Sequence, residues 1–167
     1  MSAANPDRET LRGRFDATVP AFRALVESLS DEDFERATPN DGWDCAALLF
    51  HVGYSTEYLS QVAEVTRTGK GFNVTAVLPV AVLDRMGKFI MRGGGRKATR
   101  ISLTEQFERA IDHMIASLSH VEGGQWARTT RFRGQRRELA YFYSFALEHI
   151  DEHFAEILDV VRRGTAT

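Results

Sequence analysis

Apolar residues recur at intervals of three and four in four long segments of the chain, and this periodicity limits the possible fold more than any other feature. Such spacing places the apolar side chains on one face of an α-helix, which must be buried against other elements. The four apolar faces are Leu11, Phe15, Val19, Phe22, Val26 and Leu29; Leu48, Val52, Ser55, Leu59, Val62 and Thr66; Leu103, Phe107, Ala110, Ile111, Met114, Leu118 and Val121; and Leu139, Phe142, Ala146, Ile150, His153, Ile157 and Val161. Four helices of about 20 residues with one long connection predict an all-α four-helix bundle.

Capping and breaking residues indicate where the first two helices begin and end. Pro20 lies inside the first apolar stripe, so we expect a kink there or a helix that begins near Thr18. Asp44 is a plausible N-cap for the second helix, which we expect to run to about Thr68 and to end at Gly69.

The second half of the chain contains two helices and a short extended segment. Ser102 and Glu105 have the spacing of a capping box and predict the start of the third helix. The segment Trp126 to Arg133 alternates loosely and ends at a glycine, which favours an extended excursion over a helix. We expect the last helix to begin near Arg136.

The segment from Lys70 to Arg100 is the long connection between the second and third helices. Its apolar spacing allows a helix, and Gly93-Gly94-Gly95 predicts a flexible break. A connection of about thirty residues is longer than neighbouring helices need. We therefore expect a partly helical crossover that runs the length of the bundle or contributes to a binding surface.

Composition and charge restrict the class of protein. A chain of 167 residues is expected to form one domain, 1–167, and a formal net charge of -2 argues against a nucleic-acid partner. The lone Cys45 excludes an intramolecular disulfide and a cysteine-based zinc cluster. Met1 to Phe15 lacks the apolar core of a signal peptide, and charged residues interrupt the best membrane-span candidate, Val74 to Met91. We expect a cytoplasmic protein with no membrane partner.

The five histidines fall into two groups by their helical phase. His113 and His120 lie off the third apolar stripe and are expected on the surface. His51, His149 and His153 project into or beside apolar stripes, where an imidazole needs a partner for its nitrogens. His149 and His153 stand at i and i+4 on one helix face, and His51 can complete a three-nitrogen metal site that leaves an open position.

Other interpretations of these residues remain open at this point. His149 and His153 could instead contact carboxylates such as Glu152 or Glu156, with no metal. The pattern from His149 to His153 also matches the His-x-x-Glu-His signature of inverted zinc proteases, but Glu152 lies far from the centre of the apolar stripe. Cys45 in a first helical turn is a weak candidate nucleophile because no base is paired with it in the sequence.

An ordered set of signals resembles the DinB/YfiT-like superfamily over nearly the whole chain. The signals are Trp43 at the start of the second helix, His51 about two turns later, the extended stretch Arg131 to Gly134, and the His-x-x-x-His of His149 and His153. The resemblance implies a four-helix bundle with crossed connectivity and one divalent metal held by the three histidines. It further implies an enzyme that uses a low-molecular-weight thiol, because relatives include mycothiol-dependent maleylpyruvate isomerase and bacillithiol transferases.

The expected function is therefore a thiol-dependent transferase or isomerase that acts on a small-molecule substrate. The ion would favour the thiolate form of the cosubstrate, and imidazole ligands suit zinc, nickel or iron. Tyr54 and Tyr58 are candidate orienting groups, and the candidates for acidic groups of substrate or thiol are Arg96, Lys97, Arg131 and Arg133. The resemblance and the apolar crossover also predict a homodimer. The alternative is a non-catalytic, metal-stabilised bundle that binds a small ligand or a protein.

Overall fold

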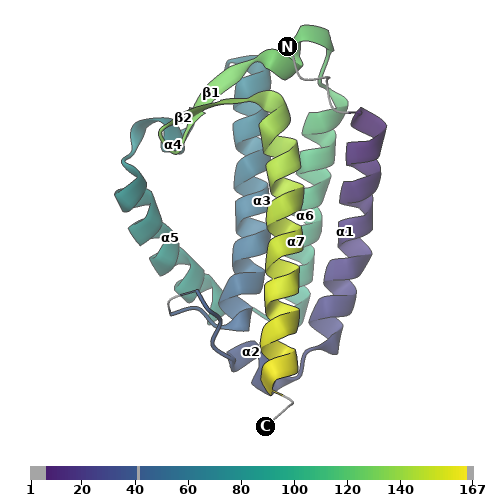
Figure 1. The fold of residues 1–167 in the computed structure, drawn as a ribbon, viewed down its shortest axis with the longest axis vertical. Helices are drawn as coiled ribbons and strands as arrows, with labels where there is room; N and C mark the ends of the chain where they lie inside the picture. Colours follow the sequence, from purple (N-terminus) through teal and green to yellow (C-terminus); the bar gives the residue numbers. More distant parts are fainter. Residues whose placement is uncertain (1–6, 41, 165–167) are drawn as a thin grey trace.

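Four long helices form the bundle in the computed structural model, which describes residues 7–40 and 42–164. They are α1 (Arg8–Ser28), α3 (Cys45–Thr68), α6 (Arg100–Ser119) and α7 (Leu139–Gly164) (Figure 1). The predicted four-helix bundle is confirmed. Residues 1–6, 41 and 165–167 of the expected domain 1–167 lie outside the described part. Among the described helices, none is long and apolar enough to cross a membrane.

The connectivity of the bundle is crossed. Helix α3 packs against α6 and α7, and α1 packs against the same two helices on the other side. In Figure 1, α1 and α7 run down the view, whereas α3 and α6 both run up it. Because α3 and α6 are consecutive long helices that run in parallel, the chain between them must return along the whole bundle.

The core between the helices contains most residues of the four predicted stripes, whereas Val19, Ser55 and Val161 are only partly buried. Phe15, Phe22 and Phe107 are fully buried, and the rings of Phe22 and Phe107 stack with centroids 4.2 Å apart. This aromatic contact joins α1 to α6, while Leu48 and Ile150 bury their side chains from α3 and α7. The apolar periodicity therefore identified most of the core, but it omitted buried residues such as Leu49 and Tyr143.

The first helix begins earlier than expected, whereas the second helix has the expected ends. Helix α1 begins at Arg8, not near Thr18, because Asp7 caps it by accepting hydrogen bonds from the backbone N–H groups of Glu9 and Thr10. Pro20 stays inside the helix on its exposed side, so the loss of one backbone donor does not end it. The ends predicted for α3 are confirmed.

The expected starts of the third and fourth helices are displaced in the structure. The N-cap of α6 is Thr99, whose capping box uses Ser102 as its third residue, so the pair Ser102 and Glu105 is not the cap. Helix α7 begins at Leu139, because the residues around Arg136 belong to a β-hairpin. The short elements before α7 are η1 (Gly123–Ala127), β1 (Thr129–Phe132) and β2 (Gln135–Glu138).

The hairpin confirms the later part of the predicted extended segment, from Thr129 onward, whereas Trp126 and Ala127 belong to η1. Phe132 pairs with Gln135 in the antiparallel ladder, so Arg133 and Gly134 form a two-residue turn. Both have positive φ angles, 47° and 81°, as the tight turns that match the twist of a hairpin require. Glycine accepts this conformation without steric cost.

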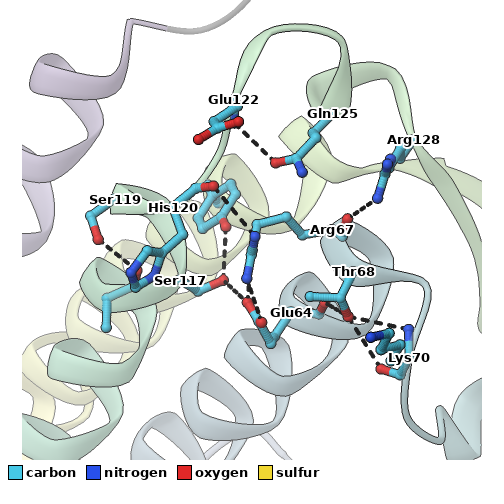
Figure 2. Close-up of polar contacts among 12 residues, drawn as sticks. Glu64, Arg67, Thr68, Lys70, Ser117, Ser119, His120, Glu122, Gln125 and Arg128 are labelled. Atoms are coloured by element: carbon cyan, nitrogen blue, oxygen red, sulfur yellow. Dashed lines mark hydrogen bonds and ion pairs between the residues drawn. The ribbon is translucent and has the colours of Figure 1, made fainter.

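A polar cluster closes the end of the bundle at which α3 and α6 end (Figure 2). Arg67 donates to Glu64 at 2.6 Å, and Ser117 from α6 donates to the same carboxylate at 3.4 Å. The Ser117 hydroxyl also lies 3.0 Å from the hydroxyl of buried Tyr143 on α7. These contacts join three helices, and Arg128 adds a hydrogen bond to the carbonyl of Arg67.

The crossover contains α4 (Val74–Val77) and α5 (Val80–Gly95). The break expected at Gly93–Gly95 is absent, since these glycines form the last turn of α5. Gly95 serves close packing, because a Cβ atom added there would lie 2.6 Å from the Cα atom of Ala47 in α3. This contact fixes α5 to the bundle at its C-terminal end, and α5 diverges from α3 toward its N-terminal end (Figure 1).

The close contact between α5 and α3 can be tested with two glycine substitutions on one helix turn. We expect Gly95→Ala to lower the free energy of unfolding by about 1–3 kcal/mol, because the added methyl group overpacks against the Ala47 backbone. Gly93→Ala, where nothing lies within 4 Å of the added atom, should be neutral or stabilise the helix by about 0.5–1 kcal/mol. Urea denaturation of the two variants measures the difference, and equal stability would contradict the packing role.

Candidate metal centre

The three histidines singled out by sequence meet between α3 and α7. His51 lies in the second turn of α3, while His149 and His153 stand one turn apart near the middle of α7. Since α3 and α7 pack side by side, the two elements present the three rings to one another. The spacing of the residues on their helices therefore brings the three rings together.

The ring nitrogens of the three histidines converge on a small volume. One nitrogen of each ring lies within 4.8 Å of the others. His51 Nε2 and His149 Nε2 are 2.9 Å apart, so in the absence of an ion one ring donates a hydrogen bond to the other. The ring centroids are 5.0 Å apart for His51 and His149, 5.2 Å for His51 and His153, and 4.4 Å for His149 and His153.

The environment of the cluster keeps two of its imidazoles uncharged. Burial, and to a smaller extent the neighbouring His149 and His153, lowers the pKa of His51 to about 3. Burial also lowers the pKa of His149 to about 4, with a contribution from His153. Neutral imidazoles offer nitrogen lone pairs, which is the form in which histidine binds metals.

His153 is held in one orientation by residues outside the cluster. Its Nδ1 lies 3.0 Å from Glu156 Oε2, and the other carboxylate oxygen of Glu156 accepts a hydrogen bond of 2.5 Å from Asn40 Nδ2. Glu156 stands three residues after His153 on α7, and Asn40 comes from the loop before α3. A carboxylate on Nδ1 directs Nε2 toward a metal, a common arrangement in metalloproteins.

The free nitrogen of His153 provides a direct test of whether the cluster suits a metal. Among the described residues, His153 Nε2 and Trp43 Nε1 are the buried side-chain nitrogen or oxygen atoms that lack a hydrogen-bond partner. A buried polar atom without a partner is costly, and a metal ion bound by Nε2 would remove that cost. The three nitrogens thus fit a divalent cation with an open fourth position.

Aromatic rings surround the cluster. Trp43 packs on His51 with ring centroids 4.8 Å apart, and Phe145 stacks on His149 with centroids 5.5 Å apart. Both aromatic residues also line a cavity of about 590 Å³ that reaches His51 and His149. The candidate metal centre is therefore open to a space large enough for a small molecule.

The alternative candidates from the sequence are placed elsewhere. Glu152 is exposed on the outer side of α7, away from the three rings. Cys45 is fully buried, and burial raises the pKa of its thiol to about 11, the opposite of the shift that activates a nucleophile. His113 and His120 are exposed, as predicted, and His113 pairs with Glu57 at 2.7 Å.

The predicted substrate-contacting residues divide into two groups. Tyr54, Tyr58 and Arg133 line the cavity. Arg96, Lys97 and Arg131 are exposed and are not among its lining residues. The sequence reasoning did not propose Asn40, Asp84 or Lys88 for the site, although all three line the cavity.

We expect Glu156→Ala to weaken metal binding about 10- to 100-fold, because it releases the His153 ring and frees its Nδ1–H. Titration of metal-free protein with zinc against a competing chelator measures the affinity. Glu152→Ala, which removes an exposed carboxylate from the same helix, is the matched control and should change the affinity less than about threefold. An equal loss in both variants would show that the contact with His153 does not orient the site.

The depressed pKa values also predict how stability depends on pH in metal-free protein. Histidine has an ordinary pKa of 6.5, so below that pH the unfolded chain binds protons that folded His51 and His149 exclude. The free energy of unfolding should therefore fall as the pH drops from 6.5 toward 4, and this loss should be absent above pH 6.5. Denaturation at a series of pH values measures the slope, which should be shallower in His51→Ala and unchanged in the surface variant His120→Ala.

Comparison with known proteins places the chain in a family and a fold. Residues 15–153 match the family described as the mycothiol maleylpyruvate isomerase N-terminal domain. No curated protein matches the chain in sequence. Among solved structures, YfiT from Bacillus subtilis, described as a probable metal-dependent hydrolase with an unusual four-helix bundle topology, is similar with a TM-score of 0.78 at 14% identity, over 98% of this chain and 91% of that one.

Two further structures share the fold. The mycothiol-dependent maleylpyruvate isomerase is similar with a TM-score of 0.71 at 12% identity over 91% of this chain, which spans 61% of the length of the isomerase. An uncharacterised protein from Clostridium difficile 630 is similar with a TM-score of 0.72 at 10% identity, over 96% of this chain and 98% of that one. The sequence match and the shared bundle establish that this chain is a DinB-like protein of the mycothiol maleylpyruvate isomerase N-terminal domain family.

Proposed function

We propose that the chain is a metal-dependent enzyme in which His51, His149 and His153 hold one divalent ion and a low-molecular-weight thiol is the cosubstrate. The observation that carries the proposal is the convergence of three imidazole nitrogens within 4.8 Å, two of them from residues that line a cavity of about 590 Å³, His51 and His149. The reaction would be a thiol transfer or an isomerisation of a small molecule. Zinc, nickel and iron all suit imidazole ligands.

The chemistry divides between the ion and the protein. A divalent ion in such a site supplies a positive charge that favours the thiolate form of a bound thiol. The histidines supply lone pairs without adding charge, and Glu156 holds His153 in place. In a transfer, a carbon–sulfur bond would form and a bond to the leaving group would break; in an isomerisation, the thiol would add to the substrate and then leave it.

The cavity residues have proposed roles that follow from their positions. Tyr54 and Tyr58 lie on α3, one and two turns beyond His51, so either ring could orient a substrate against the centre. Arg133 at the hairpin turn could receive an acidic group at the cavity wall. The roles of Arg96, Lys97 and Arg131, the homodimer and the cytoplasmic location stay predictions from the sequence.

A second candidate function is metal-dependent hydrolysis, and one observation favours it. The similar fold of YfiT belongs to a protein described as a probable metal-dependent hydrolase, and three nitrogen ligands leave a position that water could occupy in place of a thiol. The non-catalytic alternative, a metal-stabilised bundle, uses the same three histidines for stability alone. The three candidates differ in their reactants: the thiol enzyme uses a thiol, the hydrolase uses water, and the metal-stabilised bundle catalyses no reaction.

The metal and the cosubstrate can be tested separately. Protein purified without a nickel column or chelator should carry close to one equivalent of divalent metal, and His51→Ala should lose it, because two imidazoles bind much more weakly than three. Metal analysis by mass spectrometry measures the content. Well under one equivalent, with none regained on dialysis against metal, would refute the metal centre.

Metal-loaded protein is then assayed for loss of a thiol in the presence of a model electrophile. We expect thiol consumption that falls at least about 100-fold in His51→Ala, in line with the loss of a positioned electrostatic catalyst. His120→Ala is the control because it removes an exposed imidazole far from the centre. Unchanged conjugation in His51→Ala would refute the thiol enzyme, and ester hydrolysis without thiol would favour the hydrolase.

A further inference from the structure

The loop from Arg36 to Cys45 precedes α3 and is closed by its own backbone hydrogen bonds. The N–H of Cys45 donates to the carbonyl of Arg36 at 3.0 Å. Inside this pair, the N–H of Thr38 donates to the carbonyl of Trp43, and the N–H of Trp43 donates to the carbonyl of Asn40, both at 2.9 Å. Asn40 and Trp43 are therefore held in a fixed relation to each other.

Two side chains of this loop reach the candidate metal centre. Asn40 Nδ2 donates to Glu156 Oε1 at 2.5 Å, and Glu156 Oε2 lies 3.0 Å from His153 Nδ1. The Trp43 ring packs on the ring of His51 with centroids 4.8 Å apart. A change in the position of the loop would therefore be transmitted to the rings that offer nitrogens to a metal.

Arg92 of α5 contacts the same loop from outside the bundle. Its Nε donates to the carbonyl of Gly42 at 2.9 Å. A Cβ atom added at Gly42 would overlap the guanidinium group, so that group lies directly over the backbone of the loop. Gly42 also has a φ angle of 74°, which glycine adopts without steric cost. The loop is thus shaped to receive the Arg92 side chain.

Arg92 projects from the part of α5 that is fixed to the bundle. The preceding Met91 is 1% exposed. Gly94 and Gly95 both lie against α3, since a Cβ atom at Gly94 would overlap the ring of Phe50. In Figure 1, this end of α5 approaches α3, whereas the other end diverges from it. The guanidinium group therefore has a firm base from which to hold the loop.

We propose that Arg92 is a positioning residue of the candidate metal centre. It holds Gly42 and the rest of the loop in place, and Asn40 of that loop then orients His153 through Glu156. Arg92 offers no lone pair to a metal and is not among the residues that line the cavity. The inference deepens the proposed function and rests on it for its catalytic meaning, although the contacts themselves involve protein groups alone.

Zinc affinity gives the first test. We expect Arg92→Ala to weaken zinc binding about three- to tenfold, the loss that corresponds to one hydrogen bond of ordinary strength. Arg85→Ala is the matched control, because it removes the same charge from an exposed position of the same helix, and it should change the affinity less than about twofold. Competition with a chelator measures both values. Equal affinity in the two variants would overturn the positioning role.

A double-mutant cycle tests the route from Arg92 to the centre. Asn40→Ala breaks the contact with Glu156 and should itself weaken zinc binding. Adding Arg92→Ala to that variant should then cost less than about a further twofold, because the two residues act through the same contacts. Losses that multiply in full would overturn this route. Circular dichroism and urea denaturation establish that each variant is folded.

NMR of the histidine rings in metal-free, isotope-labelled protein keeps this inference separate from the proposed function. Arg92→Ala should shift the ring signals of His153 and leave those of the exposed His120 in place, whereas Arg85→Ala should leave both unchanged. If unmodified protein binds no zinc, the proposed function fails, yet a shift of the His153 signals still supports the positioning role. If zinc binds but Arg92→Ala leaves the His153 signals unchanged, the inference is overturned and the metal centre stands.

Discussion

The arrangement on which this structure depends is the packing of three imidazole rings in one largely buried volume. His51 and His149 have their nitrogens 2.9 Å apart, and burial keeps both rings uncharged. Exposed histidines would relieve such crowding by rotating into water. Here Trp43, Phe145 and the packing of α3 against α7 confine the rings. The apolar core therefore holds the three imidazoles close together, although their contact is not required for the helices to pack.

The loop before α3 is part of the same arrangement. Asn40 donates to Glu156, and Glu156 contacts His153, so a position far from α7 in sequence influences the orientation of a ring in α7. Trp43, in the same loop, covers His51. The loop thus does more than connect two helices, because its side chains limit the motion of two of the three rings.

The helices and the histidine cluster could be predicted from sequence because both follow from helical phase. The apolar stripes identified the core, and the positions of His51, His149 and His153 beside those stripes brought the rings together. Glu156 was named only as an alternative contact, and it contacts His153 through Nδ1 while leaving Nε2 available. The i to i+3 spacing makes this pair possible, but the ring nitrogen involved is decided by the rotamer.

Other features depended on contacts that no local pattern encodes. The start of α1 depends on the Asp7 cap, and Pro20 is tolerated because it faces outward. Gly93–Gly95 was expected to break a helix, yet the three glycines lie within α5, and Gly95 allows the helix to pack closely against Ala47. Asn40 and the cavity wall formed by α5 likewise required the tertiary structure, because the residues involved are distant in sequence.

The parallel course of α3 and α6 has a consequence for how such a protein can change. The chain must return along the bundle between these two helices, so it includes a segment outside the four-helix core. That segment is α5, in which only Met91 and Gly95 are buried. Substitutions on its inner face can alter the shape of the cavity without creating voids in the core, where a lost methylene costs about 1 kcal/mol. The preference for one ligand over another can therefore vary independently of the residues that make the bundle fold and of the histidines that meet at its centre.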